Sequence, residues 1–215
     1  MALIIRQESP EDHRAVENLT RQAFWNLNEP GCIEHYLVHR LRSHPDFIPE
    51  LDLVLEKDGM LVGSILYTRS WLENEHGEVK NILTFGPVSI LPGYQRKGLG
   101  SMLIQESLAK AHALGFPMVV IFGNPSNYTG LGFKSCSRYG ICVEGGIFPT
   151  AMLVKELVPG ALEALGNQTW VYHESDAFAI DPQEAADFDA MFDPMQKKEL
   201  PCQEVFYILS HSTIR

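Results

Sequence analysis

Residues 85–114 read FGPVSILPGYQRKGLGSMLIQESLAKAHAL, and this stretch decides the fold. An apolar run rich in β-branched residues, 79–90, is stopped by Leu91-Pro92-Gly93. Residues 95–100, QRKGLG, then open a helical pattern. A strand, a glycine-rich turn and a helix in this order leave unpaired N–H groups and the positive end of the helix dipole at the turn. The layout predicts an anion site.

The residues of the turn suit a pyrophosphate. Gly98 and Gly100 have no Cβ, so a large ligand can approach the backbone closely. Arg96 and Lys97 add positive charge beside them. A Walker-type loop would need Lys-Ser/Thr where Leu99-Gly100 stands, and a dinucleotide fingerprint would need its third glycine where Leu103 stands. Both common nucleotide loops are therefore excluded.

What the turn does match is Q/R-x-x-G-x-G/A after a strand, which resembles the acetyl-CoA loop of the GCN5-related N-acetyltransferase (GNAT) superfamily. A second segment, YTGLGF from Tyr128 to Phe133, resembles the Y-E-K-L-G-F segment of that superfamily. Asn124 stands only four residues before Tyr128, so the role of the family's upstream Asn is not transferred. The run FGPV, 85–88, is similar to the YhbS-like subgroup of bacterial acetyltransferases. The resemblance covers residues 1–155.

The resemblance implies the GNAT acyl-CoA N-acyltransferase fold. This is an α/β (α+β) domain whose mixed central sheet is splayed between its fourth and fifth strands, with helices on both faces. It implies acetyl-CoA as cosubstrate and Tyr128 as the general acid that protonates the departing thiolate. The residues expected to bind the cofactor are Val88, Ser89 and Ile90 along the pantetheine arm, and Gln95, Arg96, Lys97, Gly98, Leu99, Gly100 and Ser101 at the pyrophosphate.

The implied activity is transfer of an acetyl group to a primary amine by direct attack on the thioester. The alternative is a non-catalytic acyl-CoA-binding regulatory module. The general base stays open among Glu73, His76, Glu78 and water, and the acceptor is a small-molecule or a protein amine. Cys136 and Cys142 are interpreted as small buried thiols rather than nucleophiles.

Composition sets the broad class. The chain has 215 residues, of which 45% are hydrophobic, enough for a sizeable core. No run of 18 apolar residues occurs, which predicts no membrane span. The four cysteines are scattered, with no C-x-x-C pair, which predicts neither a metal site nor a disulfide framework. We expect a cytoplasmic protein with reduced thiols.

Charge divides the chain in two. Residues 1–155 carry 14 Lys/Arg and 16 Asp/Glu, whereas residues 156–215 carry 3 and 11. Neither half has the basic excess of a nucleic-acid binder. We interpret 156–215 as an acidic C-terminal extension packed on a 1–155 acetyltransferase domain. Its acids either draw a cationic acceptor or form a solvated face, and a homodimer is left open.

Periodicity predicts the remaining elements. Strands are expected at 3–6, 51–57, 60–71, 117–122, 151–157 and 170–175, and helices at 10–24, 33–43 and 183–192. His35, His39 and His44 lack the spacing of a metal helix and are interpreted as surface histidines. The alternation of Val205, Tyr207 and Leu209 predicts a final, half-buried strand that completes the core.

Overall fold

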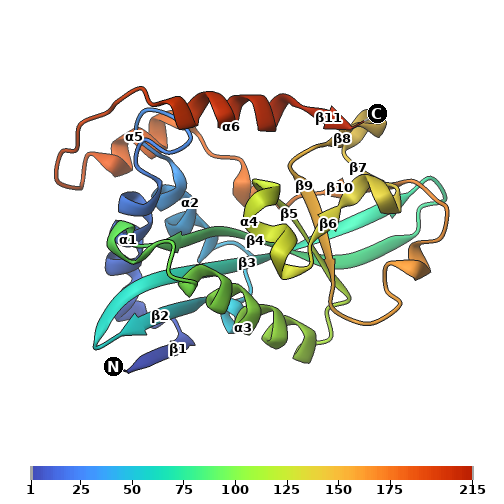
Figure 1. The fold of residues 1–215 in the computed structure, drawn as a ribbon, viewed down its shortest axis with the longest axis horizontal. Helices are drawn as coiled ribbons and strands as arrows, with labels where there is room; N and C mark the ends of the chain where they lie inside the picture. Colours follow the sequence, from blue (N-terminus) through green and yellow to red (C-terminus); the bar gives the residue numbers. More distant parts are fainter. Residues whose placement is uncertain (1, 215) are drawn as a thin grey trace.

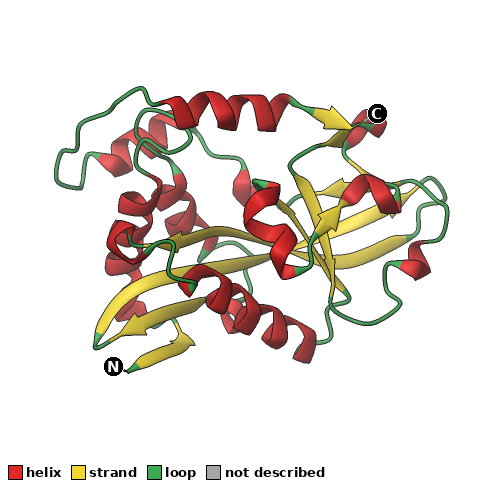
Figure 2. Ribbon diagram, in the orientation of Figure 1, coloured by secondary structure: helices red, strands yellow, loops and turns green. Residues whose placement is uncertain are grey.

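The computed structural model describes residues 2–214 and combines a large mixed sheet with helices on both of its faces (Figures 1 and 2). Its helices are α1 (His13–Phe24), α2 (Glu34–Leu41), α3 (Leu99–Ala113), α4 (Pro125–Tyr128), α5 (Pro182–Asp189) and α6 (Pro201–His211). Its strands are β1 (Leu3–Gln7), β2 (Leu53–Lys57), β3 (Met60–Asn74), β4 (Val79–Ile90), β5 (Met118–Phe122), β6 (Lys134–Ser135), β7 (Ile141–Cys142), β8 (Phe148–Pro149), β9 (Met152–Glu156), β10 (Trp170–His173) and β11 (Thr213–Ile214). Among residues 2–214, no helix is long and apolar enough to cross a membrane.

The sheet separates where β4 meets β5. Its strand order is β1-β2-β3-β4-β5-β9-β6, with β10 paired to β3 and β7. β3 and β4 pair antiparallel along most of their length. β4 and β5 run parallel and meet at one pair only, Leu83 with Val119. Beyond Leu83 the two strands diverge, which confirms the splay that the sequence predicts between the fourth and fifth strands.

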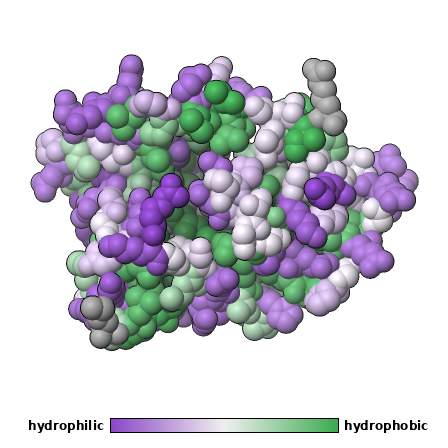
Figure 3. Space-filling view, viewed as in Figure 1, coloured by the Kyte–Doolittle hydropathy of each residue, from purple (hydrophilic) through white to green (hydrophobic). Residues whose placement is uncertain are grey.

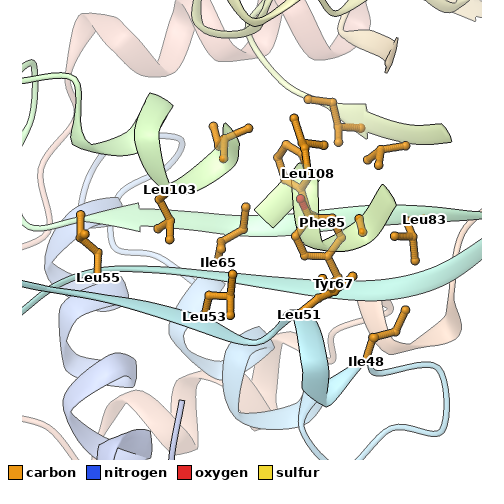
Figure 4. Close-up of a cluster of buried hydrophobic side chains, with 14 of the residues drawn as sticks. Ile48, Leu51, Leu53, Leu55, Ile65, Tyr67, Leu83, Phe85, Leu103 and Leu108 are labelled. Atoms are coloured by element: carbon orange, nitrogen blue, oxygen red, sulfur yellow. The ribbon is translucent and has the colours of Figure 1, made fainter. Parts of the chain in front are cut away.

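Two layers of helices cover the sheet. On one face, Leu103 and Leu108 of α3 pack over Ile65, Tyr67 and Phe85 (Figure 4). On the other face, side chains of α1 and α2 form a second core with β2 and β3, made of Val16, Val38, Leu41, Val54 and Leu66. The side of α3 that faces the sheet is buried, and it carries Leu99, Leu103, Ile104, Ser107, Leu108 and Ala111.

The part of the chain beyond residue 155 folds back on both the sheet and the helices. β10 joins the main sheet, pairing antiparallel with residues 71–74 of β3. α5 docks against α1, where Arg21 Nε donates to Asp189 Oδ1 at 2.6 Å. α6 then runs along one edge of the molecule, from near α5 to the β11–β8 pair (Figure 1).

The prediction of a final strand was wrong. Val205, Tyr207 and Leu209 lie in α6, where no residue is buried, so this segment does not complete the core. Pro201 occupies the first turn, and the Leu200 N–H donates to Gln203 Oε1 at 3.2 Å, a side-chain cap at the helix start. A short apolar run fits a strand or a helix equally well by periodicity, and here the start signal decided.

The prediction that His35 lies on the surface was also wrong. His35 is fully buried between α2 and α5, with its ring centroid 5.5 Å from that of Phe188 and 5.2 Å from that of Phe192. Both aromatic residues come from the C-terminal extension, more than 150 positions away along the chain. The spacing of residues within one helix cannot show that side chains so distant in sequence will bury one of them.

Candidate active site

The loop between β4 and α3 exposes backbone donors. The first helical bond runs from Met102 N–H to Gly98 O at 3.0 Å. Within residues 2–214, the N–H groups of residues 96–101 have no hydrogen-bond acceptor. Arg96 and Gly98 adopt positive φ angles of 60° and 80°, which turn the chain into the helix. The result is a set of free donors at a helix start, as an anion site needs.

The polar side chains of this loop have different tasks. Gln95 Nε2 donates to Ile90 O at 2.9 Å, which ties the loop to the end of β4. Lys97 Nζ donates to Gly93 O at 2.7 Å. Arg96 is exposed and has no ion-pair or hydrogen-bond partner in the described part of the chain, so its guanidinium is free for a ligand. Leu99 is buried and anchors the helix start in the core.

Space is open outside both glycines of the loop. A Cβ built on Gly98 would meet no atom within 4 Å, and one on Gly100 would meet only Ile90 Cγ1, at 3.6 Å. Gly98 needs its positive φ, which disfavours other residues. Gly100 is under no such constraint from the protein itself. Its lack of a side chain matters only if a ligand approaches it.

The edge of β4 beside the gap is partly free. Leu91 N–H donates to Val62 O at 2.9 Å. Because an antiparallel ladder alternates, the backbone groups of Ser89 then point toward β3, and those of Val88 and Ile90 point into the gap. The Ser89 hydroxyl is buried and donates to Thr20 Oγ1 at 2.9 Å. Of these three residues, Val88 and Ile90 can therefore offer backbone groups to a ligand, whereas Ser89 fixes α1.

Tyr128 lies across the gap from β4. Its ring centroid is 6.1 Å from that of Phe85 and 5.7 Å from that of Phe133. The ring rests on Gly123, where a Cβ would come within 2.5 Å of Tyr128 Cε2. No group among residues 2–214 hydrogen-bonds its hydroxyl, and burial raises the pKa of the phenol. Tyr128 is thus held in place, protonated at neutral pH and able to donate a proton.

The space-filling view shows where these parts meet. Figure 3 shows a hollow with an apolar floor in the region where Figure 1 places the end of β4, beside the segment that leads into α3. The free donors of residues 96–101 lie at one end of this region, and Tyr128 packs against β4 through Phe85. The arrangement suits an elongated ligand with an anionic end and a reactive end.

The three candidate bases lie elsewhere. Glu73 lies at the end of β3, and His76 and Glu78 belong to the turn that joins β3 to β4. Val88 comes nine positions after Val79, which is about 30 Å along the strand. Glu78 also accepts from Lys80 at 2.8 Å, which lowers the pKa of its carboxyl group. The structure thus keeps these three side chains far from Val88 and Ile90.

Residues from β10 reach the splay instead. The hydroxyl of Tyr172 is hydrogen-bonded to Thr84 Oγ1, and its ring centroid is 5.8 Å from that of Phe122, at the end of β5. Tyr172 therefore contacts both strands where they part. Sequence reasoning missed this residue, and no local signal could have found it, because the contact spans 88 positions. No group of three or more His, Cys, Asp or Glu residues within 2–214 is placed to hold a metal ion.

Comparison with known proteins adds independent findings. Residues 19–133, which include the loop and Tyr128, match the model of the Acetyltransferase (GNAT) family. The chain is 27% identical over 173 residues to the uncharacterized N-acetyltransferase YhbS of Escherichia coli (strain K12), covering 80% of this chain and 97% of YhbS.

Two solved structures are similar in fold. The crystal structure of YhbS from Escherichia coli in complex with CoA has a TM-score of 0.69 at 24% identity, over 83% of this chain and 92% of that one. A GNAT family acetyltransferase from Brucella melitensis in complex with acetyl-CoA has a TM-score of 0.64 at 25% identity, over 82% of this chain and 98% of that one.

Proposed function

Because this chain belongs to the acetyltransferase (GNAT) family, as its sequence pattern indicates, we propose that it transfers an acetyl group from acetyl-CoA to a primary amine. The observation that carries the proposal is the gap between β4 and β5, with free N–H donors at the start of α3 and Tyr128 packed against β4. CoA in the Escherichia coli relative's structure and acetyl-CoA in the Brucella melitensis structure support the choice of cosubstrate.

The residues of the gap suit the binding of an acyl-CoA. The donors of residues 96–101 and the guanidinium of Arg96 would bind the pyrophosphate. The backbone groups of Val88 and Ile90 that face the gap would bind the pantetheine amides and polarise the thioester carbonyl. Ile90 O already accepts from Gln95, so its N–H is the free group there.

The proposed reaction is a direct displacement. The amine gives up one proton to a base and attacks the thioester carbonyl carbon, so that a C–N bond forms. The C–S bond then breaks, and the nitrogen loses its second proton to solvent. The thiolate takes a proton from Tyr128, whose raised pKa keeps it protonated until that step. The products are the acetamide and CoA, with one proton released overall from the starting ammonium.

Calorimetry with acetyl-CoA and a thiol-reporting assay of CoA release, run over a panel of small amines and lysine-bearing peptides, test the proposal. Gly100→Val should weaken acetyl-CoA binding by at least about 2 kcal/mol, because its side chain blocks the approach of the pyrophosphate to the backbone. Gly93→Val is the matched control, since Gly93 also has open space around it and no positive φ.

The outcomes separate the alternatives. Unchanged affinity in Gly100→Val, with both variants folded, would rule out this loop as the cofactor site. Binding of acetyl-CoA by the wild-type protein without CoA release for any amine would instead favour the non-catalytic acyl-CoA-binding module.

A further inference from the structure

The segment that follows β10 continues along the edge of β3, and its apolar side chains pack on the sheet face opposite α3. At its start, the Tyr172 hydroxyl bonds Thr84 of β4. Near its end, Phe178 Cε1 lies 4.0 Å from where a Cβ on Gly86 would stand. Thr84 and Gly86 flank Phe85, directly after the last residue at which β4 pairs with β5. Tyr172 and Phe178 therefore place their side chains against β4 on either side of Phe85, and residues 173–177 connect them.

Glu174 is one of two acids in this segment, the other being Asp176. It comes directly after β10 and two residues after Tyr172, so the alternation of the strand places it on the same side as Tyr172. That side also holds Phe122 of β5, next to the Tyr172 ring. The side chain of the neighbouring His173 lies on the opposite side, where its ring stacks on Trp71 with the ring centroids 5.2 Å apart.

The Glu174 carboxylate has no protein partner. Throughout residues 2–214, no donor hydrogen-bonds it and no cation pairs with it. Burial raises the pKa of the Tyr172 phenol, and the nearby negative charge of Glu174 raises it further. The next residue, Ser175, turns its hydroxyl to Asp46 Oδ2 at 2.7 Å, near His44, and Asp176 is exposed. The carboxylate is therefore open to solvent, with no competing cation on the segment.

The surroundings of Glu174 also tune its acidity. Its side chain is reached by solvent, yet the protein around it removes enough water to raise the pKa of its carboxyl group to about 7. A base with a pKa near the working pH is the most effective at taking a proton from an ammonium ion. Among the described contacts, this carboxylate makes no hydrogen bond or ion pair that would stabilise the fold.

We propose that Glu174 is the general base of the acetyl transfer and accepts the proton of the acceptor ammonium, directly or through one water. The inference rests on the proposed function, and it adds the group that the sequence left undetermined. It also assigns a chemical task to the C-terminal extension, since Glu174 belongs to it. The proton moves from the amine nitrogen to a Glu174 oxygen before the C–N bond forms, and Glu174 later returns it to solvent.

Glu174→Gln in the full-length chain tests the role, with Asp176→Asn as the matched control on the same segment. For the best amine of the panel, Glu174→Gln should lower kcat/KM by about 10²–10⁴-fold while the affinity for acetyl-CoA changes less than about two-fold. Wild-type kcat/KM should show an acidic limb near pH 7 that Glu174→Gln lacks. Glu174→His should restore part of the rate and a limb near the imidazole pKa. If no amine is a substrate, slow hydrolysis of acetyl-CoA is the reaction followed.

A measurement without turnover completes the test. With ¹³C-labelled glutamate, the carboxyl signal missing in Glu174→Gln identifies Glu174, and it should titrate near pH 7 and shift when acetyl-CoA is added. A wild-type protein that does not bind acetyl-CoA would overturn the proposed function. Normal acetyl-CoA binding with an unmoved Glu174 signal, or with equal rates in Glu174→Gln and wild type, would overturn the role of Glu174 alone.

Discussion

At the scale of single residues, the site depends on groups that the protein leaves unsatisfied. Arg96, the hydroxyl of Tyr128 and the carboxylate of Glu174 have no protein partner within residues 2–214. Lys97 and Ser89 belong to the same sequence motifs, but their side chains already donate hydrogen bonds, Lys97 to Gly93 and Ser89 to Thr20. A motif therefore identifies the loop and the strand, and the hydrogen bonds distinguish the residues free to bind from those that hold the site together.

Tyr128→Phe tests the proposed role of Tyr128 as general acid. We expect turnover to fall by about 10²–10⁴-fold with the affinity for acetyl-CoA retained, because the ring still packs on Phe85 and Phe133 while the transferable proton is gone. Tyr139→Phe, at another partly buried tyrosine, is the control. Full turnover by Tyr128→Phe with a good acceptor would assign the proton to water instead.

His35 links stability to pH. Burial lowers its pKa to about 4, so the folded protein keeps it neutral where the unfolded chain, with a pKa near 6.5, takes a proton. Stability from this group is therefore complete above pH 6.5 and lost as pH falls toward 4, by up to about 3 kcal/mol. Asp189, which lies 3.2 Å away but is not aligned as a hydrogen bond, offsets part of the burial effect.

Urea unfolding of wild type and His35→Asn between pH 7.5 and 4.5 checks this. The stability advantage of wild type should shrink as pH falls through this window, and comparison with the variant cancels other titrating groups such as Asp52, whose pKa is raised to about 9. As a control, His112→Asn replaces an exposed histidine and should leave the pH dependence of the unfolding free energy unchanged. A constant difference across the window would contradict the burial of a neutral His35.

At the scale of elements, α6 is held at its ends rather than along its length. At its start, Gln203 Nε2 donates to Asn26 O at 3.1 Å. After its end, Thr213 and Ile214 pair with β8. Between these ends its large apolar side chains remain about half exposed: Val205 is 53% exposed, Phe206 45%, Tyr207 57% and Ile208 54%.

Removal of residues 200–215 should therefore cost little. We expect the free energy of unfolding to fall by less than about 2 kcal/mol and acetyl-CoA binding to persist, because the entropy lost in ordering the helix offsets most of what its half-exposed side chains bury. Denaturant unfolding and calorimetry measure both quantities. Loss of the folded state on truncation would mean that this segment belongs to the core after all.

At the scale of the whole molecule, the C-terminal extension is tied to the rest by a charge pair. The Arg21 side chain is 3% exposed and its Nε lies 2.6 Å from Asp189 Oδ1. Arg21 also donates to Asp193 O at 2.9 Å, and its Cζ lies 4.4 Å from the centroid of the Trp25 ring. Other acids of the extension are also engaged, since Asp181 caps α5 and Glu184 accepts from Tyr36. The proposed boundary near residue 155 thus divides the chain by sequence pattern, while contacts cross it extensively.

Asp189→Ala should destabilise the protein by about 3–5 kcal/mol, because it leaves a buried guanidinium without its counter-charge. Asp187→Ala, on the exposed side of the same helix, should cost less than about 0.5 kcal/mol. Denaturant unfolding of the two variants compares them, and equal effects would show that the pair does not dock the extension. Any test of the acidic field on acceptor binding should therefore leave Asp189 intact and neutralise exposed acids such as Asp187, Glu199 and Glu204.

Local sequence patterns were enough to predict the loop, the helix after it and most of the strands, because turn chemistry, helix starts and apolar periodicity act between residues close along the chain. They also predicted Tyr128, through a motif carried on one short segment. The packing of distant segments was needed to show that His35 is buried, that residues 201–211 form an exposed helix, and that Tyr172, two residues before Glu174, reaches Thr84 of β4. Each of these depends on partners distant in sequence, such as Phe188, Asn26 and Thr84, and no local pattern encodes which distant segment packs on which.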